Sequence, residues 1–203
     1  MFRETLLDIF NSVWPMMLIC SVIIISMRLT YIFKNKITVV LYRELLYLLF
    51  IIYVMCLFYV VSFQDVSWSS SNFTPFSEMF RYEFGTNLFF KNVIGNMLMF
   101  VPYGFFVSYI LKLKSPISMF ILSFLASITI EVTQLLIGRV FDVDDILLNI
   151  IGGIFGFYIY IALESIKRHL PKFLKKDYIY IILIIVAITL IIMYLFNIIK
   201  LGV

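Results

Sequence analysis

Charged side chains are scarce in this chain: Asp, Glu, Lys and Arg together make up 14% of its 203 residues, whereas soluble domains carry about 25%. Hydrophobic residues make up 63% of the chain. These proportions exclude an ordinary soluble globule and an intrinsically disordered chain. They also exclude a basic nucleic-acid-binding domain, because the net charge is only +4.

The residue types that most often serve as nucleophiles or soft metal ligands are equally rare. His169 is the only histidine, and Cys20 and Cys56 are the only cysteines. The two cysteines lie in apolar runs, with no metal-ligand spacing and no partners for a disulfide framework. We interpret His169, which lies in a basic segment, as a solvated loop residue. The sequence therefore offers no obvious nucleophile.

Long apolar runs are what the sequence has in abundance. A helix needs roughly 20 apolar residues to cross the hydrocarbon core of a bilayer. Six runs approach that length: Ile9–Met27, Leu45–Gln64, Val93–Leu111, Ser115–Ile130, Ile146–Leu163 and Tyr178–Ile199. The fourth is short, but we expect its helix to continue past Glu131 to about Ile137. We therefore predict an all-α, polytopic helical membrane protein with about six transmembrane helices.

The distribution of charge predicts the orientation of these helices. Eleven of the sixteen lysines and arginines lie between spans one and two, three and four, or five and six. Basic loops stay on the cytoplasmic side of a membrane, so both termini are expected outside. Nine of the twelve acidic residues then face outward.

The outer segment 64–91 is the longest stretch that does not span. Its aromatic residues are Trp68, Phe73, Phe76, Phe80, Tyr82, Phe84, Phe89 and Phe90. Aromatic residues gather at membrane interfaces, so we expect this segment to lie at headgroup level. Within it we predict a short helix over roughly Phe76–Tyr82, with Pro75 near its start.

Polar residues inside the predicted spans are concentrated at one place. Charged groups within a membrane are costly and mark functional sites by default. Helical spacing places Ser123, Ser127, Glu131 and Gln134 on one face, as it does the Asp142 to Asn149 series on the next span. The predicted topology brings these groups to the outer third of the membrane, where we expect an outward-facing polar cleft. The candidate ligand-binding residues are Asn92, Asn96, Glu131, Gln134, Arg139, Asp142, Asp145 and Asn149.

Small residues predict close helix packing around this cleft. Gly152 and Gly156 are spaced as in motifs that let two membrane helices approach closely. Gly95 and Gly104 offer the same on the third span. For the hydroxyl groups of Ser123 and Ser127 we expect hydrogen bonds back to their own helix.

Four short elements resemble the VanZ-like family. They are Asn72-Phe-Thr-Pro-Phe76, the run from Asn92 through Gly95-Asn96 to Pro102-Tyr-Gly104, Glu131-Val-Thr-Gln134, and the run from Arg139 through Asp142, Asp145 and Asn149 to Gly153. The resemblance implies a small bacterial protein of the inner membrane, in a family associated with resistance to the lipoglycopeptide teicoplanin. It divides the chain into a first helix with a basic loop (1–44), a VanZ-like core (45–162), and a basic loop with a last helix (163–203).

Two functions remain open for the cleft. The first is binding of an amphipathic ligand, either a lipoglycopeptide or a lipid-linked cell-wall precursor. Its polar part would contact the acids and Arg139, and its acyl chain an aromatic flap of Phe73, Pro75 and Phe76. The second is a membrane enzyme for a lipid-linked substrate, in which Glu131 acts with Asp142 or Asp145 as an acid–base pair. No cofactor is predicted, although the Asp cluster suits a divalent cation such as Mg²⁺.

A purely structural interpretation competes with both functions. Arg139 would then neutralise Glu131 or an aspartate, and the amide side chains would bridge the helices. Four acids against one arginine argue against it, because pairing one acid leaves the others beside like charges.

Overall fold

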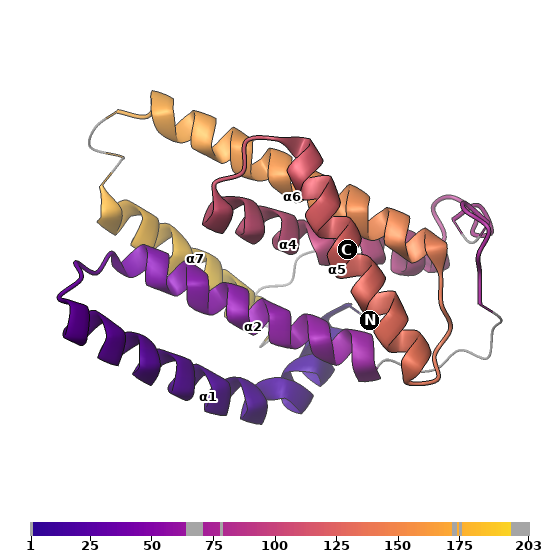
Figure 1. Ribbon diagram of the computed structural model, residues 1–203, viewed down its shortest axis with the longest axis horizontal. Helices are drawn as coiled ribbons and strands as arrows, with labels where there is room; N and C mark the ends of the chain where they lie inside the picture. The colour runs from indigo at the N-terminus through magenta and orange to yellow at the C-terminus, as the bar shows by residue number, and fades with distance from the viewer. Residues whose placement is uncertain (1, 64–70, 78, 172–173, 175, 196–203) are drawn as a thin grey trace. The chain divides into compact units, whose positions relative to one another are not determined.

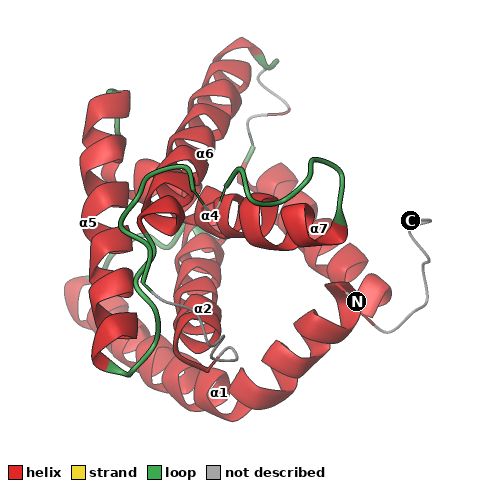
Figure 2. Cartoon of the chain, turned by 90° about the vertical axis from the view of Figure 1, so that its right-hand side faces the viewer, coloured by secondary structure: helices red, strands yellow, loops and turns green. Residues whose placement is uncertain are grey.

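The computed structural model describes residues 2–63, 71–77, 79–171, 174 and 176–195. Within these residues it is helical and has no strand (Figure 2), so the predicted all-α class is confirmed. The six long helices are α1 (Phe2–Asn35), α2 (Leu41–Phe63), α4 (Gly95–Leu111), α5 (Pro116–Leu136), α6 (Val143–His169) and α7 (Asp177–Leu195). A single turn, α3 (Asn87–Phe89), and the π-helical η1 (Phe90–Ile94) lead into α4.

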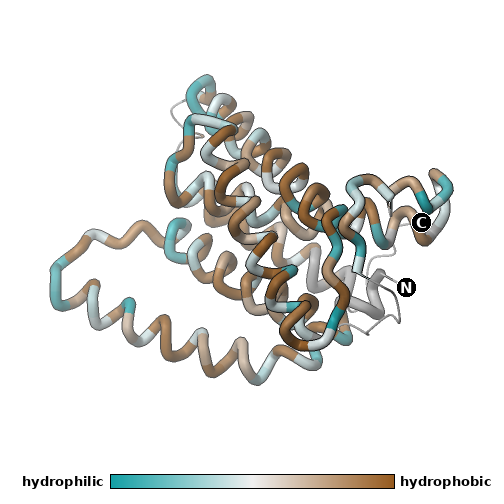
Figure 3. The backbone as a smooth tube through the Cα atoms, turned by 45° about the vertical axis from the view of Figure 1, so that its right-hand side comes forward, coloured by the Kyte–Doolittle hydropathy of each residue, from teal (hydrophilic) through white to brown (hydrophobic). Residues whose placement is uncertain are grey.

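Five of the long helices are long and apolar enough to cross a membrane. These stretches are Leu7–Asn35, Leu41–Ser62, Asn92–Leu111, Pro116–Leu136 and Val143–His169. Hydrophilic residues gather mainly at helix ends and in the connecting turns (Figure 3). The protein is therefore a multi-pass membrane protein, as predicted.

The predicted sixth span, Tyr178–Ile199, is supported only in part. It coincides with α7, whose apolar stretch Asp177–Leu190 is shorter than a span. Residues 196–199 of the prediction lie outside the described residues, as does Trp68.

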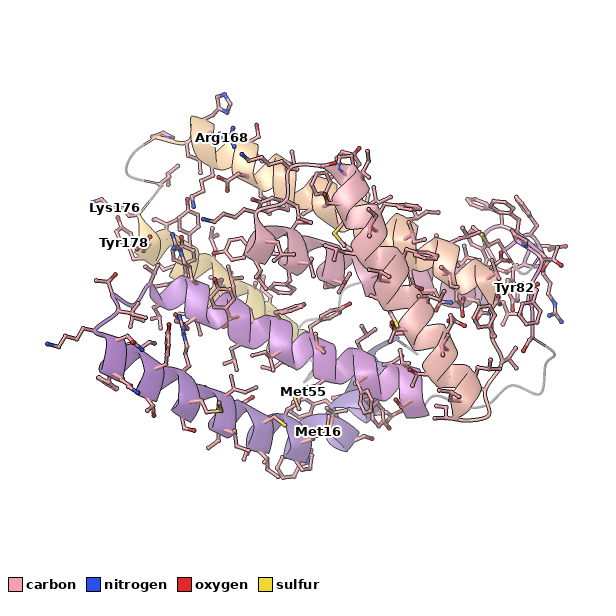
Figure 4. All side chains as sticks on the ribbon, viewed as in Figure 1. Met16, Met55, Tyr82, Arg168, Lys176 and Tyr178 are labelled. Atoms are coloured by element: carbon pink, nitrogen blue, oxygen red, sulfur yellow. The ribbon has the colours of Figure 1, made fainter. Side chains whose placement is uncertain are left out.

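The chain divides into two compact units. We call residues Val61–His169 the core unit, and residues Met1–Val60 with Leu170–Val203 the flanking unit. In the flanking unit, Arg28 forms a two-pronged ion pair with Glu44. Its Nε and one terminal nitrogen each donate to a carboxylate oxygen of Glu44 at 2.9 Å. The rings of Tyr42 and Tyr180 are 5.2 Å apart. Lys176 lies near the ring of Tyr178 at the start of α7 (Figure 4).

In the core unit, α4 and α6 lie side by side and α5 packs against α6 (Figure 1). Glycines allow the close approach of α4 and α6. A Cβ atom on Gly104 would overlap the carbonyl oxygen of Gly153, and one on Gly152 or Gly156 would overlap a carbonyl oxygen of α4. The predicted role of these glycines is confirmed.

The same prediction is wrong for Gly95. A Cβ atom there would meet only the carbonyl oxygen of Phe90, at an ordinary distance of 3.5 Å. That oxygen belongs to the turn just before Gly95 and not to a neighbouring helix.

Candidate functional site

The segment between α2 and α4 is described from residue 71 onward except at residue 78, and we call residues 71–86 the aromatic loop. The helix predicted over Phe76–Tyr82 is not present, because the described residues there form turns and bends. Phe76 has a φ of +69°, in the left-handed region. A right-handed helix cannot run through such a residue, so this prediction is wrong.

Asn72 fixes the start of the aromatic loop to the segment that precedes α6. Its backbone N–H donates to the carbonyl of Phe141 at 2.8 Å, and its carbonyl accepts from Val143 N–H at 3.1 Å. Its side chain donates to the Asp142 carboxylate at 2.9 Å. The Asn72 side-chain oxygen also accepts from Thr74 N–H and from the Ser77 hydroxyl. Asn72 is therefore hydrogen-bonded at every polar group.

Asp144 holds the middle of the same loop. Its side chain is 1% exposed. One carboxylate oxygen accepts from the backbone N–H of Phe76, and the other accepts from that of Met79 at 3.1 Å. A carboxylate near the first turn of a helix is favoured by the helix dipole, and α6 starts one residue earlier.

Glu131 and Asp142 connect the end of α5 to the start of α6. The Glu131 side chain is 1% exposed and accepts the backbone N–H of Asp142 at 2.9 Å. Asp142 precedes the first residue of α6, and its carboxylate accepts from Asp144 N–H at 2.8 Å. This hydrogen bond is that of a helix N-cap.

Asp145 completes what we call the acidic cluster, which consists of Glu131, Asp142, Asp144 and Asp145. Its carboxylate accepts from the side-chain amide of Asn96 and so joins α4 to α6. The structure therefore brings together four of the predicted site residues: Asn96, Glu131, Asp142 and Asp145. Each of the three acids in this set accepts from an N–H donor.

Arg139 and Gln134 make a different contact. Both donate to the backbone carbonyl of Val61, Gln134 at 3.4 Å. Within the part of the chain that the structure describes, Arg139 forms no ion pair with a carboxylate. A direct ion pair is therefore missing among these residues, although Arg139 lies within electrostatic range of Glu131 and Asp145.

Two further predicted residues make no hydrogen bond to the acidic cluster within the described part of the chain. Asn92 is half-buried in η1 and makes no side-chain hydrogen bond to a described residue. Asn149 is buried deeper along α6, and its amide donates to the hydroxyl of Ser127 at 2.9 Å. The expectation that Ser127 bonds back to its own helix is wrong, because this hydroxyl faces α6.

Four phenylalanine side chains of the loop are largely exposed. Phe73 is 69% exposed, Phe76 52%, Phe80 83% and Phe84 89%. The Phe73 ring stacks on Phe141 with centroids 5.4 Å apart, and Phe76 lies 6.3 Å from Phe80. Pro75, the third residue of the predicted flap, is exposed as well. Carboxylates at the start of α6 thus hold a loop that exposes four phenylalanine rings, alongside the exposed side chains of Arg81 and Glu83.

The arrangement limits the chemistry of the cluster. Glu131 meets Asp142 through a backbone N–H and not through its carboxyl group. Among the described residues, no group of three or more His, Cys, Asp or Glu side chains is placed to hold a metal ion.

Sequence reasoning missed two residues of this site, Asn72 and Asp144. Asp144 is one of the four acids counted from the sequence, but it lies off the helical face that carries Asp142, Asp145 and Asn149 and so was not among the candidate ligand-binding residues. Asn72 is the first residue of the first element that resembles the VanZ-like family. Its place in that element was the sequence signal that could have identified it as a site residue.

These features define a class of protein: a multi-pass helical membrane protein in which carboxylates at helix ends anchor an aromatic loop. The model of the VanZ/LLP1 family matches residues 44–164 of the chain. The protein belongs to this family, and the acidic cluster and the aromatic loop lie inside the matching region. No curated protein and no solved structure matches the chain.

Proposed function

We propose that this protein resides in the inner membrane of a bacterium and modulates resistance to lipoglycopeptide antibiotics of the teicoplanin type. It does so by binding either the drug or an amphipathic component of the cell envelope. The positive-inside rule, applied to the basic loops, supports an orientation with both termini and the acidic cluster on the outer side. Membership of the VanZ/LLP1 family supports this assignment.

The observation that carries the proposal is the exposed apolar surface of the aromatic loop beside a polar anchor. Phe80 and Phe84 are more than four-fifths exposed, which is costly in water and favourable against an acyl chain. A cleft at the outward end of the core unit would receive the polar part of the same ligand. A ligand with a lipid tail and a polar head matches both surfaces.

The polar groups of the site have capacity left for such a head group. An ionised carboxylate offers about four acceptor positions, and Asp145 uses one of them for Asn96. Amine and amide groups of a ligand would donate to the remaining positions. The guanidinium of Arg139, which donates to Val61, offers further N–H groups to a carboxylate or phosphate.

Drug susceptibility of cells expressing Phe76→Ala/Phe80→Ala tests the proposal, with membrane abundance matched to the wild type. Losing two apolar contacts of about 1.5 kcal/mol or more each weakens ligand binding by about 100-fold, so protection should be lost. Phe120→Ala is the control, because Phe120 is exposed on α5 but lies outside the loop. Full protection by the double variant would refute the proposal.

A second candidate, an enzyme acting on a lipid-linked envelope substrate, is favoured by the burial of Glu131 beside Asp142. Glu131 with Asp142 or Asp145 would supply acid–base catalysis through water. The lipid composition of cells that express the wild-type protein should then differ from that of cells that express the Glu131→Gln variant. An unchanged lipid profile would remove this alternative and leave ligand binding.

A further inference from the structure

The face of α5 that packs in the core unit carries three polar side chains, each one helical turn from the next: Ser123, Ser127 and Glu131. Ser123 and Ser127 are fully buried, and Glu131 is 1% exposed. At 1.5 Å per residue, the series extends about 12 Å along the span. Polar groups therefore continue well below the acidic cluster, toward the middle of the helix.

The hydroxyl groups of α5 behave in two different ways. Thr129 and Thr133, which are exposed, each donate to the carbonyl four residues earlier, at 2.7 Å. Such back-bonding satisfies a hydroxyl within its own helix. Ser127 instead accepts from Asn149 of α6, and Ser123 has no hydrogen-bond partner among the described residues. The buried hydroxyls are thus directed at the α5–α6 interface.

Two buried polar atoms at this interface lack a partner in the part of the chain that the structure describes: the Ser123 hydroxyl and the side-chain oxygen of Asn149. They lie on adjacent levels of the same helix pair. Asn149 contacts Ser127, while Ser123 lies against Gly153, one turn further along each helix. Leaving an amide oxygen and a hydroxyl unpaired in an apolar interior is costly.

We infer that one or two water molecules bind between α5 and α6, donating to the Asn149 oxygen and accepting from the Ser123 hydroxyl. The two groups are neutral, and one accepts while the other donates, which matches water. A hard cation would need six or more oxygen ligands. Buried waters typically make about three hydrogen bonds to groups that are otherwise unsatisfied, and the Ser127 hydroxyl is close enough to Asn149 to supply the third.

This water site changes the environment of Glu131. Its carboxylate contacts Asp142 N–H, while Ser127, at the upper edge of the water site, lies one turn away along α5. The core unit is then hydrated beneath a carboxyl group that has almost no exposed surface.

Water-edited solid-state NMR on the full-length protein in lipid bilayers tests the inference, with ¹³C-labelled serine, asparagine and threonine. Magnetisation from water should build up on the side chains of Ser123 and Asn149 several-fold faster than on Thr129, which lies on the same helix but faces outward. Build-up at Ser123 and Asn149 as slow as at Thr129 would overturn it.

The melting temperature of Ser123→Ala gives an independent test, because its sign differs between a wet and a dry interface. With water bound, the substitution leaves the water and Asn149 with fewer partners and lowers the melting temperature by about 2–4 °C. In a dry interface it removes an unpaired hydroxyl, so the melting temperature is unchanged or rises. That result would also overturn the inference. Thr129→Val is the control for loss of an outward hydroxyl from the same helix.

Discussion

Removing the carboxylate of Asp144 should release the aromatic loop. The two oxygens of this buried side chain accept from the backbone N–H groups of Phe76 and Met79. A hydrogen bond to a charged group contributes about 1.5–3 kcal/mol, so Asp144→Ala should favour local opening of the loop by about 3–6 kcal/mol. Asp144→Asn keeps one acceptor oxygen and should lose about half of that.

Limited proteolysis with chymotrypsin, which cleaves after aromatic residues, measures this opening in the intact protein in nanodiscs. When closing is fast, the cleavage rate follows the population of the open form. Because each 1.4 kcal/mol is a factor of ten, cleavage at Phe76 and Phe80 should rise about 10²–10⁴-fold in Asp144→Ala. Asp144→Asn should fall between Asp144→Ala and the wild type.

Glu83→Ala is the matched control, because it removes an exposed acid from the same loop. Its cleavage rate should equal that of the wild type. If Asp144→Ala is cleaved no faster than Glu83→Ala, the carboxylate does not anchor the loop and the reasoning fails.

Two further predictions concern packing in each unit. Gly104→Ala places a methyl group against the carbonyl of Gly153 and should lower the free energy of unfolding by about 1–3 kcal/mol. Gly95→Ala, with only an ordinary contact at 3.5 Å, should be neutral or slightly stabilising in the same unfolding assay; equal losses in both would contradict the packing. In the flanking unit, a double-mutant cycle of Arg28→Gln and Glu44→Gln should give a coupling of about 0.5–1 kcal/mol, because the pair is partly exposed. A coupling of zero would show that this ion pair adds nothing to stability.

Properties that depend on short-range sequence were predicted well. Apolar length predicted five of the membrane helices, because a bilayer imposes a minimum length on any span. The spacing of Gly152 and Gly156 predicted the close approach of α4 and α6, since packing motifs repeat with the helical period. Helical spacing and the order of the spans also predicted that Glu131 and Asp145 lie near each other, and both belong to the acidic cluster in the structure.

The conformation of the aromatic loop could not be predicted in the same way. Its residues carry signals for a short helix, but the acceptor for Phe76 N–H is Asp144, 68 positions away in the sequence. Asn72 likewise bonds to Asp142 across 70 positions. A pattern within the segment contains no information about such partners, and the left-handed backbone of Phe76 depends on them.

Counting charges in the sequence identified the acidic residues of the cluster but not the groups that compensate them. In the sequence, four acids lie near one arginine, so pairing one acid leaves the others beside like charges, and the cluster suits a divalent cation. In the structure, the compensating donors are backbone N–H groups of the aromatic loop and of the start of α6, together with the side-chain amide of Asn96 on α4. Asp142 and Asp144 therefore hold the loop, while Glu131 and Asp145 hold the helices beside it. It follows that loss of function in an acid variant is informative only beside a proteolysis measurement. A variant with an intact loop and lost protection implicates the carboxylate in binding, whereas a released loop explains the loss through the phenylalanines.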